Sequence, residues 1–350
     1  MSSAKSITIV GGGLAGLALG IGLRQRGIPA TVWEAGRYPR HRVCGEFISG
    51  RGQAVLERLG LLDLCRQAGA IEARTVLFVA GNARSPVRAL TVPALCVSRH
   101  TLDATLAASF RGLGGELRTE SRWTASPEPD GVVHASGRRP AQAGQPSRWF
   151  GVKAHVPAGC RVPLEADLEM HLSADGYVGM NRLGGGEVNV CGLFRSREGG
   201  QRPDSRQDWL RGAPDSLLRE RLKEAVFEPE SFCSVAGLQL SPRRAAAQPQ
   251  CCIGDALTMT PPATGNGMSM AFESAEMALA PLADFSEGRL DWPAARREIA
   301  RRCDAAFGPR LAWARALQWM LMSPVSRSGL GRWLLRSDRV WQILFARTRG

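Results

Sequence analysis

A glycine-rich run near the N-terminus is the first stretch whose residue types and spacing could do chemistry. The residues Gly11-Gly12-Gly13-Leu14-Ala15-Gly16 fit the pattern G-x-G-x-x-G. In that pattern the first glycine allows a tight turn, the second lets the backbone approach a pyrophosphate, and the third lets a helix pack closely on a strand. The N–H groups at the start of the following helix would face the phosphates, together with the positive end of the helix dipole. The run therefore predicts a dinucleotide site.

An acidic residue at the expected distance strengthens this prediction. Glu34 follows the glycines by about 20 residues, where a carboxylate accepts hydrogen bonds from ribose hydroxyls. The surrounding sequence predicts a βαβ unit, with a strand at 6–10, an apolar helix at 14–26 that ends at Gly27, and a strand at 30–34. A carboxylate here disfavours a 2′-phosphate, so FAD or NAD fits better than NADP.

A second motif with chemical potential comes late in the chain. The segment Cys252-Ile253-Gly254-Asp255-Ala256 closes an apolar strand predicted at 249–255, and Pro261-Pro262-Ala263-Thr264-Gly265-Asn266-Gly267-Met268 follows it. At a strand end, Asp255 can accept hydrogen bonds from a polyhydroxyl chain. The turn before Gly267 offers backbone N–H groups at a helix start, which favours a developing negative charge.

Together the two motifs resemble the p-hydroxybenzoate hydroxylase-type flavoproteins and the related geranylgeranyl reductases. The resemblance implies that the first motif binds the ADP half of FAD and that Gly-Asp binds the ribitol and phosphate region. It also implies that the late helix start lies beside the pyrimidine edge of the flavin and stabilises the reduced, anionic form. An arginine that contacts the FAD phosphates in the family matches Arg99. The cofactor-binding residues implied for this chain are Gly11, Gly13, Leu14, Ala15, Gly16, Glu34, Arg42, Arg99, Gly254, Asp255, Pro262, Gly265, Gly267 and Met268.

Two further residues are candidates for the catalytic face. The segment Arg42-Val43-Cys44-Gly45-Glu46 resembles a Cys-Gly element near the flavin in the reductase branch, which makes Cys44 a candidate for contact with substrate. Its alternative role is that of a small buried hydrophobic residue. The segments 175–180 and 186–192 resemble substrate-domain strands of geranylgeranyl-reductase-like enzymes, so Tyr177 is a candidate for the substrate pocket. Plain sheet packing is the alternative for Tyr177.

Two departures from related families bear on the reaction. Many aromatic hydroxylases carry an Asp-Gly pair linked to FAD and to the nicotinamide nucleotide, whereas the matching stretch here is Ala135-Ser136-Gly137-Arg138. The missing Asp argues against the usual nicotinamide dependence, so NADH or NADPH as a transient electron donor and a protein donor both stay open. The chain also lacks the W-x-W-x-I-P element of flavin halogenases, and neither Lys153 nor Lys223 lies in the first-strand region. We therefore do not expect halogenation.

The elements that position these motifs predict a discontinuous α/β fold. Amphipathic helices are expected at 53–68 and at 99–113, the second with Thr101 as its cap. The section from 150 to 240 is strand-rich, contains one helix at 205–225 and a last strand at 231–240, and reads as a separate antiparallel layer. We expect a glutathione-reductase-type Rossmann FAD-binding domain with an inserted β-rich substrate domain and a helical C-terminus. The predicted boundaries are 1–72, 96–148 and 245–290 for the FAD-binding domain, 73–95 and 149–244 for the substrate domain, and 291–350 for the helical region.

Composition and charge limit the classes of partner that we expect for this protein. The net charge is +13, but the basic residues are scattered and no nucleic-acid signature occurs, so no nucleic-acid partner is expected. Nine cysteines without a CxxC pair indicate reduced thiols and the cytoplasm, and the five histidines show no metal-ligand spacing. The basic helical region 310–350 either covers the FAD domain or contacts a membrane surface or carrier protein.

These observations predict an FAD-dependent monooxygenase-type oxidoreductase. The expected substrate is an apolar aromatic, polyketide-like or lipid molecule of secondary metabolism. A geranylgeranyl-reductase-like enzyme that reduces C=C bonds of an isoprenoid or lipid is the alternative. A flavin-binding partner protein without turnover is the second alternative.

Overall fold

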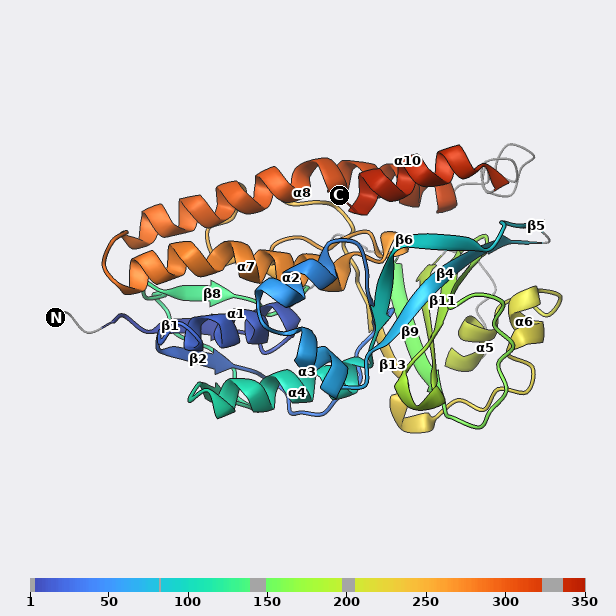
Figure 1. Ribbon diagram of the computed structural model, residues 1–350, viewed down its shortest axis with the longest axis horizontal. Coiled ribbons are helices and arrows are strands. Elements are labelled where there is room, and N and C mark those ends of the chain that lie inside the picture. Colours follow the sequence, from blue (N-terminus) through green and yellow to red (C-terminus); the bar gives the residue numbers. More distant parts are fainter. Residues whose placement is uncertain (1–3, 82, 139–148, 197–204, 323–335, 350) are drawn as a thin grey trace.

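Two sheets divide the protein into two parts that lie side by side. The computed structural model describes residues 4–81, 83–138, 149–196, 205–322 and 336–349. Figure 1 shows a small sheet with its helices at one end of the molecule and a large sheet at the other, with two long C-terminal helices along one side.

The small sheet is parallel throughout and is assembled from distant parts of the chain. Its strand order is β14-β8-β1-β2-β7. The strands are β1 (Ile7–Val10), β2 (Ala30–Trp33), β7 (Glu116–Arg118), β8 (Val132–His134) and β14 (Cys251–Cys252). The strand predicted at 249–255 is thus shorter than expected. It pairs with β8, so the late Gly-Asp motif follows the edge strand of the sheet that begins with the glycine loop.

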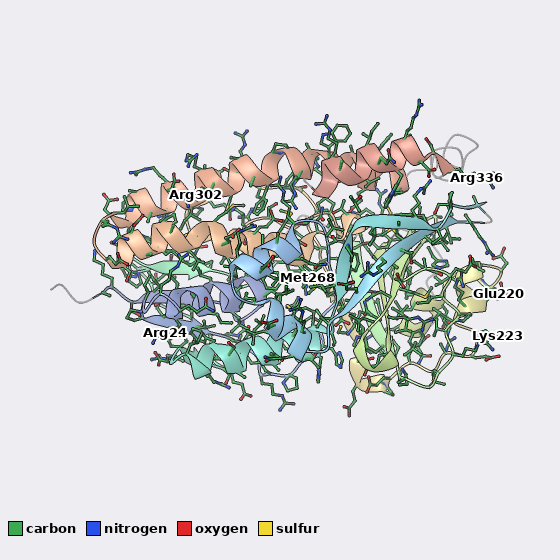
Figure 2. The ribbon with its side chains drawn as sticks, in the orientation of Figure 1. Arg24, Glu220, Lys223, Met268, Arg302 and Arg336 are labelled. Atoms are coloured by element: carbon green, nitrogen blue, oxygen red, sulfur yellow. The ribbon has the colours of Figure 1, made fainter. Side chains whose placement is uncertain are left out.

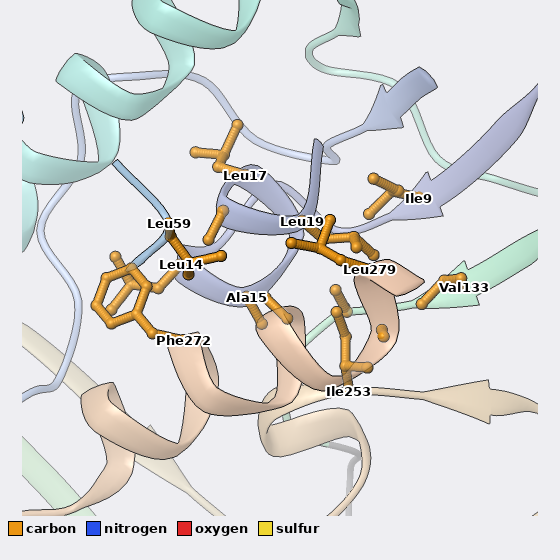
Figure 3. Packing of buried hydrophobic residues seen from close by; sticks show 14 of the residues in the cluster. Ile9, Leu14, Ala15, Leu17, Leu19, Leu59, Val133, Ile253, Phe272 and Leu279 are labelled. Atoms are coloured by element: carbon orange, nitrogen blue, oxygen red, sulfur yellow. The ribbon is translucent and has the colours of Figure 1, made fainter. Parts of the chain in front are cut away.

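Three helices cover this sheet: α1 (Leu14–Arg24), α4 (Arg99–Gly112) and α7 (Gly267–Ser286). The close-up in Figure 3 shows Leu14 and Ala15 of α1 packed against Phe272 and Leu279 of α7. A continuous apolar cluster joins these helices to the strands. Because α1 and α7 each begin at one of the two predicted cofactor motifs, their packing holds the motifs in a fixed relation.

The large sheet combines early and middle segments in the order β13-β9-β12-β11-β10-β4-β6-β3, with β5 paired to β4. Its strands are β3 (Phe47–Ile48), β4 (Ile71–Ala80), β5 (Ala83–Arg84), β6 (Arg88–Cys96), β9 (Trp149–Val156), β10 (Leu168–Leu172), β11 (Gly176–Arg182), β12 (Val188–Arg195) and β13 (Cys233–Ala236). The strands between residues 150 and 240 pair antiparallel, as expected, whereas β10 runs parallel to β4, which comes from an earlier segment of the chain. The strand predicted at 231–240 ends at Ala236, before Gly237 turns to a φ of +72°.

Two predicted helices are each broken in two. The helix predicted at 53–68 is divided into α2 (Gly52–Arg58) and α3 (Leu62–Gln67), because Gly60 adopts a φ of +66° between them. The helix predicted at 205–225 is divided into α5 (Arg206–Arg211) and α6 (Leu217–Arg221) by Gly212, whose φ is +71°. A left-handed residue ends an α-helix, and periodicity alone does not reveal it.

The cap of α4 also differs from the prediction. Ser98, and not Thr101, occupies the N-cap, and its side chain accepts a hydrogen bond from the His100 N–H. Thr101 instead donates to the carbonyl oxygens of Ala68 and Ser98. The helix therefore begins at Arg99, as predicted, with its cap at the preceding residue.

The C-terminal helices α8 (Trp292–Met322) and α10 (Asp338–Arg349) lie along the molecule. Within the described residues, α10 reaches the large sheet through Trp341, whose ring contacts Phe78 of β4 at 5.4 Å between centroids. Arg88 of β6 forms an ion pair of 3.0 Å with Asp338. No helix in the described ranges is both long enough and apolar enough to span a bilayer.

Candidate cofactor site and the sheet that faces it

The glycine loop lies between β1 and the start of α1. Gly11 has a φ of +111°, and a Cβ atom there would overlap the Ala135 carbonyl, so only glycine fits. A Cβ on Gly16 would overlap the carbonyl oxygen of Gly11, which explains how helix and strand approach so closely. In contrast, no atom lies within 4 Å of a Cβ built on Gly13, the N-cap of α1. The loop is thus tight on its protein side and open where a phosphate would lie.

Glu34 lies directly against this loop. Its Oε2 accepts from the Gly12 N–H at 2.9 Å, and its Oε1 accepts from the Gly36 N–H at 2.8 Å. Arg40 forms an ion pair of 2.7 Å with the same carboxylate. Tyr38 also holds the loop, since its hydroxyl donates to the Gly12 carbonyl oxygen at 2.5 Å. The acid therefore sits beside the glycines, as a ribose-binding carboxylate must.

Two arginines predicted to bind the cofactor meet on one buried aspartate. Arg99 donates through Nε and Nη2 to both Asp103 oxygens, at 2.7 and 2.9 Å. Arg42 donates through Nε to Asp103 at 2.9 Å. The Nη2 atom of Arg42 is buried without a hydrogen-bond partner among the described residues, and lies 3.7 Å from a Glu34 oxygen. Sequence reasoning missed Asp103, although its place four residues after Arg99 in a helix was a usable signal.

The late Gly-Asp motif touches α1. A Cβ on Gly254 would lie 2.9 Å from the Cβ of Ala15, and the Gly254 N–H donates to Ser274 Oγ at 2.9 Å. The Asp255 side chain is solvent-exposed, yet protein crowds it on most sides. This crowding raises the pKa of Asp255, while the charges of Arg99 and Arg138 lower it.

The second glycine turn leads into α7. Pro262 opens a short 3-10 turn (Pro262–Thr264), and Ser49 donates to the Gly265 carbonyl oxygen at 3.0 Å. Asn266 at the N-cap of α7 makes no side-chain cap, so the first N–H groups of α7 point out of the helix without that partner. Met268 is buried in the core, and Figure 2 places it in the middle of the molecule, where the two parts meet.

Tyr177 and Cys44 lie where the large sheet meets the cofactor side. Tyr177 is 6% exposed and belongs to an apolar cluster that joins Leu193 of the sheet to Ala263 of the second motif. Burial raises its pKa well above the ordinary value. Cys44 is half-buried. Burial raises the pKa of its thiol against the opposing charge of Arg99, so the group stays protonated at neutral pH.

A polar cluster that sequence reasoning did not find ties this segment to the sheet. Glu46 is fully buried at a φ of +56°. Its Oε1 accepts from the Arg99 N–H at 2.9 Å and pairs with Lys153 at 3.1 Å, and its Oε2 contacts His155 Nε2 at 2.6 Å. Burial alone would raise the pKa of Glu46, but the His155 hydrogen bond and the Lys153 charge hold it below its usual range.

Asn189 reinforces the same contact. Its Nδ2 donates to the Gly45 carbonyl oxygen at 2.9 Å and to the Cys44 carbonyl oxygen at 3.3 Å. Lys153 and His155 of β9 and Asn189 of β12 therefore bind the three consecutive residues 44–46 on the cofactor side. No local sequence pattern predicted these contacts, because the contacting residues are more than 100 positions apart in the chain.

The histidines are scattered in the sequence, but three of them gather here. The His41 ring stacks on His100 at 4.4 Å between centroids and meets His155 edge-on at 5.1 Å. Even so, no group of three metal-binding side chains among the described residues is arranged to hold a metal ion.

These donors fit a dinucleotide diphosphate. The open space at Gly13, the uncapped N-terminus of α1 and the unpartnered Nη2 of Arg42 all offer N–H groups to phosphate oxygens. Glu34 lies against the glycine loop, and Asp255 follows Gly254, which lies beside Ala15 of α1.

Comparisons with known proteins agree with this site. Residues 4–155 match the family of the FAD binding domain. Monooxygenase 1 of Arabidopsis thaliana is 35% identical over 102 residues, which cover 29% of this chain and 26% of that protein. The matched part thus spans about a quarter of that relative.

Solved structures share the whole fold. The flavin-dependent brominase Bmp2 superposes with a TM-score of 0.75 at 17% identity, covering 99% of this chain and 94% of that chain. PqsL of Pseudomonas aeruginosa, described as a probable FAD-dependent monooxygenase, superposes with a TM-score of 0.70 at 15% identity, covering 94% of this chain and 100% of that chain. Residues 4–155 thus carry an FAD binding domain, and the two-sheet fold of the whole chain is the fold of these solved flavoproteins.

Proposed function

We propose that this protein is an FAD-dependent monooxygenase that acts on a largely apolar small molecule. One observation carries the proposal: an apolar cluster joins Tyr177 and Leu193 of the large sheet to Ala263 of the second cofactor motif. A substrate held between sheet and flavin would meet this cluster. Its side chains offer apolar area and one aromatic ring, which suits an aromatic, polyketide-like or lipid substrate.

The roles of the chain's own residues follow from their positions. The open N-terminus of α1 and Arg42 would hold the diphosphate, and Glu34 and Asp255 would accept from ribose and ribityl hydroxyls. The N–H groups at Gly267 and Met268 would face the pyrimidine edge, where the dipole of α7 favours negative charge. Bound FAD would supply two-electron transfer and the activation of O2. The apolar cluster would exclude water from the reacting face.

The electron donor belongs to the same proposal. We expect NADH or NADPH to bind transiently, since no second dinucleotide motif occurs in the sequence. The segment after β8 carries Ala135 and Ser136 where many aromatic hydroxylases have Asp-Gly, so a weaker dependence on a nicotinamide nucleotide is expected.

The test uses the purified, FAD-loaded protein. The flavin is reduced without oxygen by NADH or NADPH, and oxygen labelled with a heavy isotope is then admitted with a set of aromatic acids, phenols and lipids. PqsL has been solved with 2-aminobenzoylacetate, so that compound belongs in the set. A product that carries one labelled oxygen atom supports the monooxygenase. Peroxide release without oxygenated product, under every substrate, contradicts it.

A reductase of isoprenoid or lipid C=C bonds is the second candidate function. The observation that favours it is the position of Cys44, half-buried beside Arg99 with a protonated thiol. Such a thiol could donate a proton to one carbon of the double bond while hydride adds to the neighbouring carbon. Saturated product formed without oxygen supports this function. A flavin that no nucleotide reduces would favour the third candidate, a flavin-binding partner protein without turnover.

A peripheral surface contact is proposed for the C-terminal helices. Trp319 is 71% exposed, Ile343 55% and Trp313 39%, all on α8 or α10, in a chain with a net charge of +13. Exposed aromatic and apolar side chains on basic helices suit an anionic lipid surface. Cosedimentation with vesicles should rise with the anionic lipid fraction and fall in Trp319→Ser/Ile343→Ser. Equal binding to neutral vesicles, or none to either kind, contradicts the proposal.

A further inference from the structure

A chain of titratable side chains runs from the protein surface to a buried lysine. Glu187, whose side chain is 41% exposed, lies 3.3 Å from His155 Nδ1. His155 Nε2 contacts Glu46 Oε2 at 2.6 Å, and Glu46 Oε1 lies 3.1 Å from Lys153 Nζ. Lys153 Nζ also lies 3.1 Å from His41 Nδ1. Each link is within reach of a hydrogen bond or a close ion pair, and every member can take up and release a proton.

The inner end of this chain faces the part of the sheet that meets the cofactor side. The strand register pairs Lys153 with Cys191 on one neighbouring strand and with Cys233 on the other, so all three side chains share one face. Both thiols are half-buried, whereas Lys153 is fully buried. The positive charge of Lys153 lowers the pKa of both thiols against the larger effect of burial. Lys153 therefore lies between two partly accessible thiols on one face of the sheet.

A purely structural role does not explain well why a lysine occupies position 153. Lysine occurs three times among 45 basic residues, and one of the three is completely buried here. For a clamp on a carboxylate, arginine is the better residue, because it binds in two places and never loses its charge. Lysine differs in that it can give up a proton. Burying the ion pair also costs several kcal/mol per charge before pairing, which a role in proton transfer would justify.

Either reaction proposed above takes one proton from solvent in each turnover. Hydroxylation converts substrate, O2, one reduced nicotinamide and one proton into hydroxylated product, oxidised nicotinamide and water. Reduction of C=C converts substrate, one reduced nicotinamide and one proton into saturated product and oxidised nicotinamide. In both reactions the electron pair comes from the nicotinamide. The proton must cross the protein to a site that excludes water.

We propose that Glu187, His155, Glu46 and Lys153 form the path that carries this proton from solvent to the sheet face at Cys191 and Cys233. The consumption of the proton rests on the proposed function, whereas the existence of the path rests on the contacts between these four residues. A proton that enters at Glu187 passes to His155 and then to Glu46. Lys153 releases its own proton from Nζ to the proton-consuming site on the face that carries Cys191 and Cys233, and then takes up the proton held by Glu46. These four are relay residues and do not touch substrate.

Other charged groups around the path define its setting. Among the described residues, the side chains of His41, Glu46, Cys191 and Cys233 lie near Lys153 from neighbouring elements. His100 of α4 stacks on His41, and burial, followed by the Lys153 charge, lowers the pKa of His41 to about 4. His41 is therefore neutral at physiological pH and accepts from Lys153 at Nδ1.

The first test changes the relay without removing its hydrogen bonds. His155→Gln keeps an N–H donor beside Glu46 but cannot relay a proton, and Glu187→Gln alters only the exposed entrance. We expect each to lower turnover by at least about tenfold, with a larger solvent deuterium isotope effect and unchanged FAD affinity. The matched control is His171→Gln, which removes another buried histidine bonded to a carboxylate, Glu169, from the opposite face of the sheet. Unchanged turnover and isotope effect in both relay variants would overturn the proposal.

The second test needs no turnover. In FAD-free protein, the ring of His41 is titrated by NMR in the wild type and in Lys153→Met/Glu46→Gln, which removes both charges and leaves no unpaired ion. Because Lys153 depresses the pKa of His41, that pKa should rise in the double variant. An unmoved His41 titration overturns the link between the two residues. If the wild type never turns over any substrate, the proposed function fails, and this titration still tests whether Lys153, the inner end of the path, is charged beside His41.

Discussion

Gly13→Ala should separate cofactor binding from folding. Gly13 has an extended backbone (φ −85°, ψ −170°), which alanine adopts without strain, and its Cβ would meet no atom within 4 Å. Loss of the preferred glycine at the helix N-cap costs at most about 1 kcal/mol. The melting temperature of the FAD-free protein should therefore fall by no more than roughly 3 °C. The new methyl group would, however, occupy the space that a pyrophosphate needs.

The magnitude for FAD follows from that overlap. Losing the phosphate contacts at α1 should weaken FAD binding by about 100-fold, or about 2.7 kcal/mol. Quenching of flavin fluorescence during titration of apoprotein measures this. Gly16→Ala is the comparison, because its Cβ would overlap the Gly11 carbonyl and so destabilise the apoprotein by about 1–3 kcal/mol. Gly112→Ala is the matched control, because its Cβ also meets no atom within 4 Å. Gly112 ends α4, roughly 20 Å from the first residue of that helix, Arg99. Wild-type FAD affinity in Gly13→Ala would refute the assignment of this loop to the phosphates.

Three further predictions address the rest of the site. Asp255→Ala should weaken FAD binding by about 10–100-fold through loss of hydrogen bonds to a charged acceptor, and a variant that purifies with full yellow colour would contradict this. Cys44→Ser should keep FAD but change turnover, whereas unchanged kinetics would leave Cys44 with a packing role. The pKa of His41, lowered by burial to about 4, lies below that of an unfolded histidine near 6.5, so the unfolded chain binds the extra proton between these values. The free energy of unfolding should then fall by about 1–2 kcal/mol from pH 6.5 to 4, after allowance for solvent screening. In His41→Asn, the free energy of unfolding, measured with urea at each pH, should change less steeply with pH. An identical slope in that variant would exclude His41 as its source.

Local patterns were enough to predict the parts of the fold that depend on short stretches. The βαβ unit, the late Gly-Asp strand and the helix at Gly267 follow from spacing and glycine chemistry, and each is present in the structure. The discontinuous α/β architecture was also predicted, because two cofactor motifs so far apart must meet in one fold. Helix boundaries were less predictable, since the breaks at Gly60 and Gly212 depend on positive φ angles, which apolar periodicity does not reveal.

The site was predictable only where a single segment carries the function. Glu34 lies against the glycine loop, and Gly254, next to Asp255, lies against Ala15 of α1, as the two motifs require. The Glu46–Lys153–His155 cluster was not predictable, because it depends on which strands are neighbours and on their register. The parallel seam between β4 and β10 brings residues of the first hundred into the middle sheet, and no local pattern specifies that pairing.

The division of both sheets among distant segments has a consequence for how the chain is made. The small sheet needs β14 at its edge, and α1 needs α7 for its apolar face, so neither is complete until about residue 286 has been synthesised. An N-terminal fragment that ends where the matched FAD domain ends would lack both the edge strand and the second cofactor motif. Nascent chains would therefore expose the apolar face of α1 for most of translation, a state that favours aggregation and chaperone binding. Cofactor capture can follow only after nearly the whole chain has emerged, and FAD then stabilises completed molecules selectively over truncated ones.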